Sequence, residues 1–198
     1  MSLFLAIPIP PEIGQPILEQ LQSDFSDVTI EWFNPHSLHL TTAYLSTRFM
    51  KQTEAQLIEK FRREGWMQQL VRPLPASFKL RLDQLRWFGH HEILVLAGRR
   101  GMKCRELRQL ADRSRFVLSQ VGGSDIGSTW GFEPHVSLGR PMVLPLPDPG
   151  EGVFTVTPTK LEMRVDTVAL YQRCEGEPEH EYHIVEDCTL GTLIKRAP

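Results

Sequence analysis

Apolar positions along the chain follow two spacings that predict strands and helices in turn. Short apolar and β-branched runs between turn residues predict six strands, over 3–7, 37–45, 77–82, 92–97, 133–139 and 165–171. Apolar residues that recur every three to four positions predict three helices, over 11–25, 52–64 and 102–121. The first helix opens with prolines, which suit a first turn, and the last ends at a Gly-Gly pair.

The order of these elements mixes hairpin-length connections with longer crossovers, which favours an α+β fold with antiparallel or mixed sheets. A chain of 198 residues has room for a continuous core, so we expect a single domain over 1–198. The proline-rich stretch 141–150 predicts a connecting loop, because proline cannot continue a central strand.

Composition narrows the class of protein without indicating its chemistry. With 41% hydrophobic and 23% charged residues, the chain is neither a disordered nor a membrane-inserted protein by these averages. The apolar start lacks a basic leader and is broken by prolines, which favours a first buried strand over an export signal. Three scattered cysteines have neither disulfide-framework nor zinc-site spacing. We therefore expect a cytoplasmic protein.

The charge balance limits how the protein could hold a nucleic acid. A net charge of −2 provides no global field for a long phosphate backbone, so such a substrate would be gripped over a few nucleotides. Between Arg99 and Arg115, however, basic residues far outnumber acidic ones. A solvated helix face is the commoner explanation of such a run, and an RNA-tracking surface is the alternative.

Two of the predicted strands carry the same pattern of histidine, apolar residue and hydroxyl residue. Side chains alternate across a strand, so His39 shares one face with Thr41, and His135 shares one face with Ser137. Each imidazole then lies about 6.6 Å from a hydroxyl residue along one surface, which suits a phosphate between them. Nearly half the chain separates the two copies, as expected for two lobes that contribute equivalent strands to one site.

Paired histidines are suited to opening a cyclic phosphodiester with water. One group must take a proton from the nucleophile, and another must give a proton to the departing ribose oxygen. Histidine, with an ordinary pKa near 6.5, can do either without a metal. The hydroxyls of Thr41 and Ser137 would donate hydrogen bonds to the non-bridging phosphate oxygens as negative charge grows on them.

Other chemistries find less support. Several histidines occur in close pairs: His36 with His39, His180 with His183, and His90 beside His91. A separation of three on a strand puts two rings on opposite faces, and no carboxylate or cysteine cluster accompanies them, so we expect no metal site. No glycine loop precedes a lysine in the manner of a phosphate cradle, so we expect no nucleoside triphosphate or other cofactor.

At the two motifs the sequence resembles the two-histidine (2H) phosphoesterase superfamily, and within it the bacterial and archaeal RNA 2′,3′-cyclic phosphodiesterases, also described as 2′-5′ RNA ligases. The segments 3–10, 168–173 and 181–183 extend the resemblance over most of the chain. It implies two pseudo-symmetric lobes, each with a mostly antiparallel sheet and helices, around a central cleft. It also implies His39 as proton donor, His135 as proton acceptor and an RNA 2′-phosphomonoester as product, although the residues by themselves leave the acid and base roles open.

The sequence departs from the family pattern at two positions. Ser137 stands where threonine is commoner, and we expect the chemistry to survive because serine keeps the hydroxyl. Thr42 replaces a bulky apolar residue on the packing face and bears on substrate preference.

Arg140 matches a basic residue after the second motif and could neutralise phosphate, but alternation places it opposite His135 unless the strand bends near Gly139.

Three aromatic residues flank the motifs and could stack on bases at the rim of the site, namely Tyr44, Trp130 and Phe132. Core packing or loop anchoring is the commoner role for each. We predict a monomer that hydrolyses 2′,3′-cyclic phosphates at RNA 3′ ends. The alternatives are a phosphodiesterase for a small cyclic-phosphate nucleotide, a 2′-5′ RNA ligase, and a non-catalytic module that binds RNA ends. Binding alone does not require two proton-transfer groups, which argues against the last.

Overall fold

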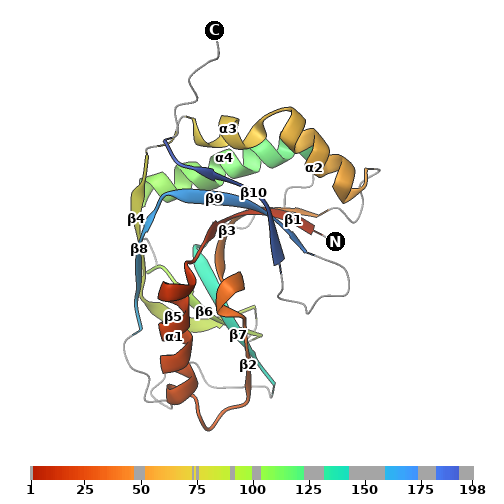
Figure 1. Cartoon of the computed structure of the whole chain (residues 1–198). Coiled ribbons are helices and arrows are strands. Elements are labelled where there is room, and N and C mark those ends of the chain that lie inside the picture. Colours follow the sequence, from red (N-terminus) through yellow and green to blue (C-terminus); the bar gives the residue numbers. More distant parts are fainter. Residues whose placement is uncertain are drawn as a thin grey trace.

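The strands of the protein form two four-stranded antiparallel sheets and a two-stranded ribbon (Figure 1). The structure is a computed structural model, and it describes residues 2–46, 52–72, 74, 76–89, 92–99, 104–122, 132–142, 159–173 and 182–191. The first sheet runs in the order β10 (Tyr182–Thr189), β9 (Thr167–Arg173), β1 (Ser2–Pro8) and β3 (His39–Ser46). The second runs in the order β2 (Ile30–Trp32), β7 (His135–Pro141), β6 (Ile93–Ala97) and β5 (Gln84–Phe88). The ribbon pairs β4 (Phe78–Leu82) with β8 (Leu161–Val165).

Helices cover the two sheets unequally. The described helices are α1 (Pro11–Asp24), α2 (Glu54–Arg63), α3 (Trp66–Val71) and α4 (Arg105–Gly122), with a 3-10 turn η1 (Pro35–Ser37). Helices α2, α3 and α4 lie over one face of the first sheet, whereas α1 lies in the lobe of the second sheet (Figure 1). A capping box starts α2, because Thr53 and Gln56 each accept a hydrogen bond from the other's backbone N–H.

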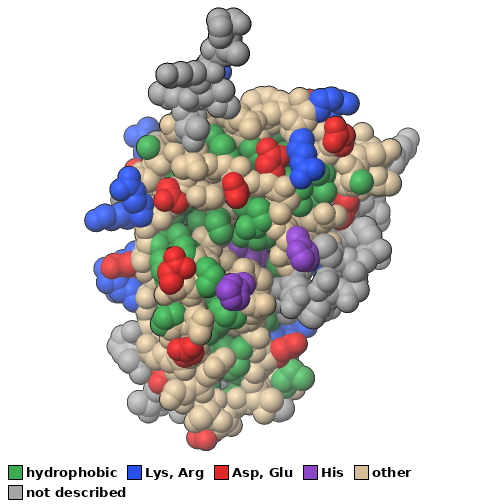
Figure 2. Space-filling view, viewed as in Figure 1, with side chains coloured by type: hydrophobic (Ala, Val, Ile, Leu, Met, Phe, Trp, Pro, Cys, Tyr) green, Lys and Arg blue, Asp and Glu red, His purple; other side chains and the backbone are tan. Residues whose placement is uncertain are grey.

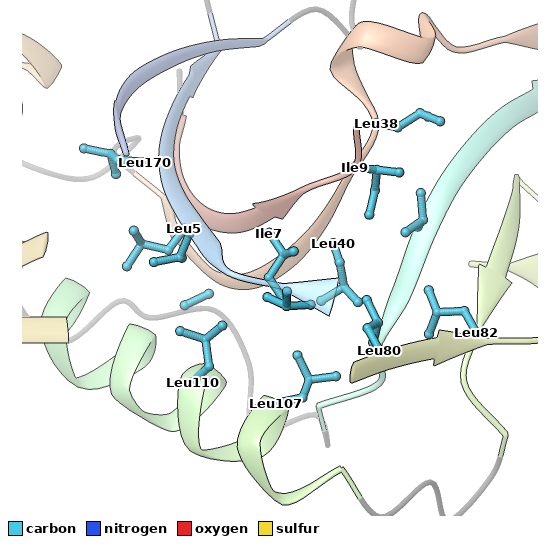
Figure 3. Close-up of a cluster of buried hydrophobic side chains, with 14 of the residues drawn as sticks. Leu5, Ile7, Ile9, Leu38, Leu40, Leu80, Leu82, Leu107, Leu110 and Leu170 are labelled. Atoms are coloured by element: carbon cyan, nitrogen blue, oxygen red, sulfur yellow. The ribbon is translucent and has the colours of Figure 1, made fainter. Parts of the chain in front are cut away.

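One apolar core joins α4, the first sheet and the ribbon. Leu107 and Leu110 of α4 point toward Leu5 of β1 and Leu40 of β3, and Leu80 of β4 extends the cluster (Figure 3). All five side chains are almost fully buried. This packing occupies the helix-covered face of the first sheet and leaves its opposite face for other side chains.

The predicted elements are confirmed, with ends that differ by three residues or fewer where the structure describes them. One strand prediction is wrong in detail: the stretch 165–171 contains a break at Asp166, where β8 ends and β9 begins. The hydrophobic pattern did not predict β2, β5, β8, β10 and α3. Most of these elements are short, and β5 follows β4 after a single residue, so no cluster of turn residues separates the two strands in the sequence. The α+β class with antiparallel sheets is confirmed.

The two motif strands occupy matching places in the two sheets. Each has a register irregularity at the third residue after its histidine, so that Thr42 in β3 and Leu138 in β7 have no partner on the neighbouring strand. The flanking pairs correspond one to one: His39 with Pro8, Thr41 with Ala6 and Ala43 with Leu5 in the first sheet, and His135 with Ala97, Ser137 with Val95 and Gly139 with Leu94 in the second. The lobes are therefore related by pseudo-symmetry down to the position of a bulge.

Candidate active site

The two motif strands come into contact where the two sheets meet. Strand β3 of the first sheet touches strand β7 of the second. Burial along both strands follows the predicted alternation: His39, Thr41, His135 and Ser137 are half-buried, whereas the residues between them are buried. Figure 2 shows histidine side chains gathered in the middle of one face at this level, with part of the purple surface set back behind its neighbours.

Both motif histidines are held by the same local hydrogen bond. Nδ1 of His39 lies 2.7 Å from the carbonyl oxygen of Ser37, and Nδ1 of His135 lies 2.8 Å from the carbonyl oxygen of Glu133. A carbonyl oxygen can only accept, so Nδ1 carries the proton and donates it in each ring. In both rings Nε2 is then the unprotonated nitrogen of the neutral form, and so the atom suited to take up a proton.

His39 lies in a cluster of three aromatic rings. The centroids of Phe4, Tyr171 and Tyr182 are 4.8, 5.2 and 5.1 Å from the centroid of the imidazole. Phe4 and Tyr171 are stacked on each other, and burial raises the pKa of the Tyr171 phenol, so that ring stays neutral. Aromatic faces attract cations, so these rings could contact a protonated imidazole.

The surroundings of His135 favour its neutral form. Burial lowers the pKa of His135, and this effect outweighs the hydrogen bond to Glu133 and the charge of that residue, which both act to raise it. The nearby Arg86 guanidinium lowers the pKa further while it forms an ion pair with Glu133. One aromatic ring, that of Phe88, stacks on the imidazole with centroids 4.5 Å apart. The neutral form of His135 is therefore favoured.

The aromatic neighbours obey the same pseudo-symmetry as the histidines. Phe4 of β1 pairs with Tyr171 of β9, and the matching residue of β6, Ile93, pairs with Phe88 of β5. Tyr171 and Phe88 are thus equivalent, and each contacts the histidine of its own sheet. The two sites differ at Phe4, whose place is taken by isoleucine in the second sheet, and at Tyr182 of β10, which adds a further ring beside His39.

The hydroxyl residues and Thr42 separate clearly into two groups. Thr41 and Ser137 share the faces of their histidines, and neither hydroxyl has a hydrogen-bond partner among the described residues. Thr42 is buried on the opposite face, where its Oγ1 lies 2.9 Å from both the Leu5 carbonyl oxygen and Oγ of Ser114 in α4. Thr42 is on the packing face, as predicted, and anchors the first sheet to α4.

The bend on which a role for Arg140 depends is present. The bulge in β7 lies between Ser137 and Gly139, and beyond it the alternation of burial is offset by one residue. Arg140 is half-buried, as are His135 and Ser137, while its neighbours Gly139 and Pro141 are buried. The offset is consistent with Arg140 on the His135 face, and its contact with phosphate stays a prediction.

The three flanking aromatic residues differ in their surroundings. Tyr44 is 43% exposed and pairs across the strands with Phe4, so it shares the sheet face of His39. Phe132 packs against the core beneath the guanidinium of Arg115, which gives this ring a structural role. Trp130 lies outside the described residues.

Solved structures of similar shape include two proteins that span nearly the whole chain. TT0787 of Thermus thermophilus is 25% identical with a TM-score of 0.69, and the match covers 96% of this chain and 98% of that chain. Escherichia coli LigT complexed with 3′-AMP is 23% identical with a TM-score of 0.68, at the same coverage. LigT complexed with phosphate is 21% identical with a TM-score of 0.65, and the match covers 96% of both chains.

The chain has the fold of the 2H phosphoesterases. The predicted resemblance to this superfamily is thereby confirmed at the level of the fold. No protein-family model and no curated protein matches the sequence. In this 2H phosphoesterase fold, the two motif strands lie at the junction of the lobes, as the resemblance implies.

Arg86 was missed by the sequence analysis. It lies on β5, pairs with Val95 of β6, and Val95 pairs with Ser137 of β7, so all three share one face of the second sheet. The alternating sequence 84–88 contains the signal, with Trp87 buried between partly exposed neighbours. Because the stretch contains charged and polar residues, its hydrophobic pattern did not indicate a strand.

The described part of the chain contains neither a cluster of metal-binding side chains nor a helix suited to span a membrane. No group of three or more histidine, cysteine or acidic side chains suited to a metal ion occurs there. His90, His91 and His180 lie outside it. No helix of that part combines the length and the apolar character needed to cross a membrane.

Proposed function

We propose that this protein is a phosphodiesterase that opens 2′,3′-cyclic phosphates at RNA 3′ ends through the paired imidazoles of His39 and His135. The observation that carries the proposal is the matched Nδ1 hydrogen bond, which makes Nε2 the atom suited to proton exchange in both rings. Two proton-transfer atoms on contacting strands suit a displacement in which nucleophile and leaving group lie on opposite sides of phosphorus.

The two environments suit different proton-transfer roles. His135, whose pKa is lowered by burial, is neutral near pH 7 and takes a proton from water as the oxygen attacks phosphorus. His39, among three rings, acts in its protonated form and gives its Nε2 proton to the ribose 3′ oxygen as the P–O3′ bond breaks. Water and the cyclic diester become an RNA 2′-phosphomonoester, and the two histidines exchange protonation states.

The remaining groups act on the charge of the phosphate. The Thr41 and Ser137 hydroxyls donate to its non-bridging oxygens, and the cation of Arg86 lies on the face of Ser137. Tyr44, exposed on the face of His39, offers a ring for the terminal base. Crystal structures of LigT with 3′-AMP and with phosphate support a nucleotide phosphate as a ligand of this fold.

The test is turnover of a short RNA that ends in a 2′,3′-cyclic phosphate by EDTA-treated protein. We expect a product heavier by one water whose new phosphate is released by a phosphatase and lies on the 2′ oxygen. Replacing His39 or His135 by alanine should lower kcat by about 10²–10⁴ with little change in affinity. Full turnover by either variant would contradict the proposal.

His183 provides a matched control for the alanine variants. It pairs with Gln172, whose side chain donates to Glu54 of α2, so His183 lies on the helix-covered face of the first sheet, away from His39. His183→Ala should therefore leave kcat unchanged. If the wild type ignores RNA but opens cyclic mononucleotides, the substrate is a small metabolite and the RNA part of the proposal is wrong.

A further inference from the structure

The outer face of the β4–β8 ribbon presents basic side chains. Along both strands the residues alternate between a buried apolar face and an exposed charged face. The exposed side chains are Lys79 and Arg81 on β4 and Glu162 and Arg164 on β8. Together with Ser77, they line a pocket of about 600 Å³ over the ribbon.

Two of these cations are direct neighbours across the ribbon. Lys79 and Arg164 are cross-strand partners, and like charges at such positions repel each other. Neither forms an ion pair with a carboxylate among the described residues, whereas Arg81 is paired with Asp83 at 3.1 Å. The Arg164 guanidinium is also held in place, because its Nε donates to Oγ of Ser77 at 2.7 Å. An anion between the two cations would relieve the repulsion.

The wider surface is basic although the whole chain is slightly acidic. Five cations against three carboxylates leave a local balance of +2: Lys79, Arg81, Arg99, Lys160 and Arg164 against Asp83, Glu162 and Asp166. The pKa of Glu162 is lowered first by its hydrogen bond from Lys160 and then by the surrounding positive charges, including that of Lys79. In Figure 2, lysine and arginine side chains gather along the left edge, where Figure 1 draws β4 and β8.

The ribbon lies between the two catalytic lobes in the chain path. Strand β4 leads into β5, which carries Phe88 beside His135, and β8 leads into β9, which carries Tyr171 beside His39. Six residues of nearly continuous strand lead from Leu82 to Phe88 and from Val165 to Tyr171, a distance on the order of 20 Å. A ligand that reached both places would be an oligonucleotide rather than a mononucleotide.

We infer that the outer face of the β4–β8 ribbon binds the phosphodiester backbone of the RNA whose 3′ end lies at the histidines, with Lys79 and Arg164 as the two phosphate contacts. The inference rests on the proposed function for the identity of the polyanion. The existence of an anion site on the ribbon does not depend on the proposed function, because it follows from the facing cations Lys79 and Arg164.

The expected effect can be estimated from counterion release. Each phosphate contact on a single strand contributes about 0.7 to the slope of the logarithm of affinity against the logarithm of salt concentration. Lys79→Gln together with Arg164→Gln should lower that slope by about 1.4 and weaken binding of a dodecamer RNA by about 25-fold at 0.1 M salt. The melting temperature should stay the same or rise, because the variant removes a like-charge pair.

The experiment measures two quantities on the same proteins. Fluorescence anisotropy gives the affinity for a labelled dodecamer with a 3′-hydroxyl, and turnover is measured on a dinucleotide that ends in a cyclic phosphate and is too short to reach the ribbon. Arg62→Gln with Arg63→Gln is the control, because it removes the same two charges from the exposed surface of α2. We expect weaker dodecamer binding in the ribbon variant alone and unchanged dinucleotide turnover in both.

The outcomes distinguish this inference from the proposed function. Equal loss of dodecamer affinity in both variants would show a non-specific charge effect and overturn the ribbon site. Unchanged affinity in the ribbon variant would overturn it too. If no cyclic phosphate is opened but the ribbon variant still loses dodecamer affinity and salt dependence, the proposed function fails while the RNA site stands.

Discussion

Replacing Phe4 by leucine should change one limb of the pH–rate profile and leave the other in place. The Phe4 ring is the nearest of the three around His39, with centroids 4.8 Å apart, and is 2% exposed. Leucine keeps the site apolar and removes only the ring. A cation–π contact contributes about 0.5–2 kcal/mol, and about 1.36 kcal/mol corresponds to one pH unit.

The predicted shift has a definite direction. Without the ring, the protonated imidazole of His39 is less favoured, so the acid is lost at lower pH. The descending limb of kcat/KM should therefore move down by about 0.4–1.5 pH units. The ascending limb reports the neutral base, His135, which contacts Phe88 instead, and it should not move.

Phe88→Leu is the reciprocal control. It removes the ring stacked on His135, so it should move the ascending limb to lower pH and leave the descending limb unchanged. Both profiles are measured with the cyclic-phosphate dinucleotide below the melting temperature of each variant. If Phe4→Leu moves the ascending limb, the acid and base roles are reversed, and if it moves both limbs equally, the two rings do not separate the titrations.

Three further predictions concern the framework of the site. Thr42→Val should cost about 1–3 kcal/mol of unfolding free energy, because it leaves the buried Ser114 hydroxyl without its partner. Thr42→Val with Ser114→Ala should recover most of that loss in urea denaturation, and additive losses would contradict the hydrogen bond. Burial lowers the pKa of His135, so the unfolded chain takes up its proton first as pH falls below 6.5, and folded stability is lost from there downward. His135→Gln should remove this pH dependence of the unfolding free energy, which is at most about 1.4 kcal/mol per pH unit. Parallel curves of unfolding free energy against pH for wild type and variant would be evidence against a lowered pKa of His135. Gly139→Ala would place a Cβ 2.8 Å from Ile30 Cγ2 and 3.0 Å from the Glu31 carbonyl oxygen of β2. We therefore expect a loss of about 1–3 kcal/mol of unfolding free energy and a lower kcat. Wild-type thermal stability in this variant would refute the close approach of β2.

Local patterns were sufficient for most of the elements and for the histidine pair. A hydrophobic period is a property of neighbouring residues, so the alternation around His39 and His135 already placed each hydroxyl on the face of its histidine. The two copies of the motif predicted two equivalent strands, and the shared bulge shows how far this equivalence extends. The sequence also showed that a role for Arg140 would require a bend near Gly139, because strict alternation placed that residue on the opposite face from His135, but it did not show whether the bend exists.

Tertiary pairing decided what differs between the two halves of the site. The rings around His39 come from β1, β9 and β10, and those strands are brought together only by the first sheet. Arg86 acts on His135 from two strands away, and Lys79 meets Arg164 because β4 pairs with β8. Electrostatic and ring contacts depend on distance in space, and residues far apart in sequence come close to one another only when the sheets form. The chain alone therefore predicted which groups could exchange protons, and the fold supplies the different surroundings from which their acid and base roles are proposed.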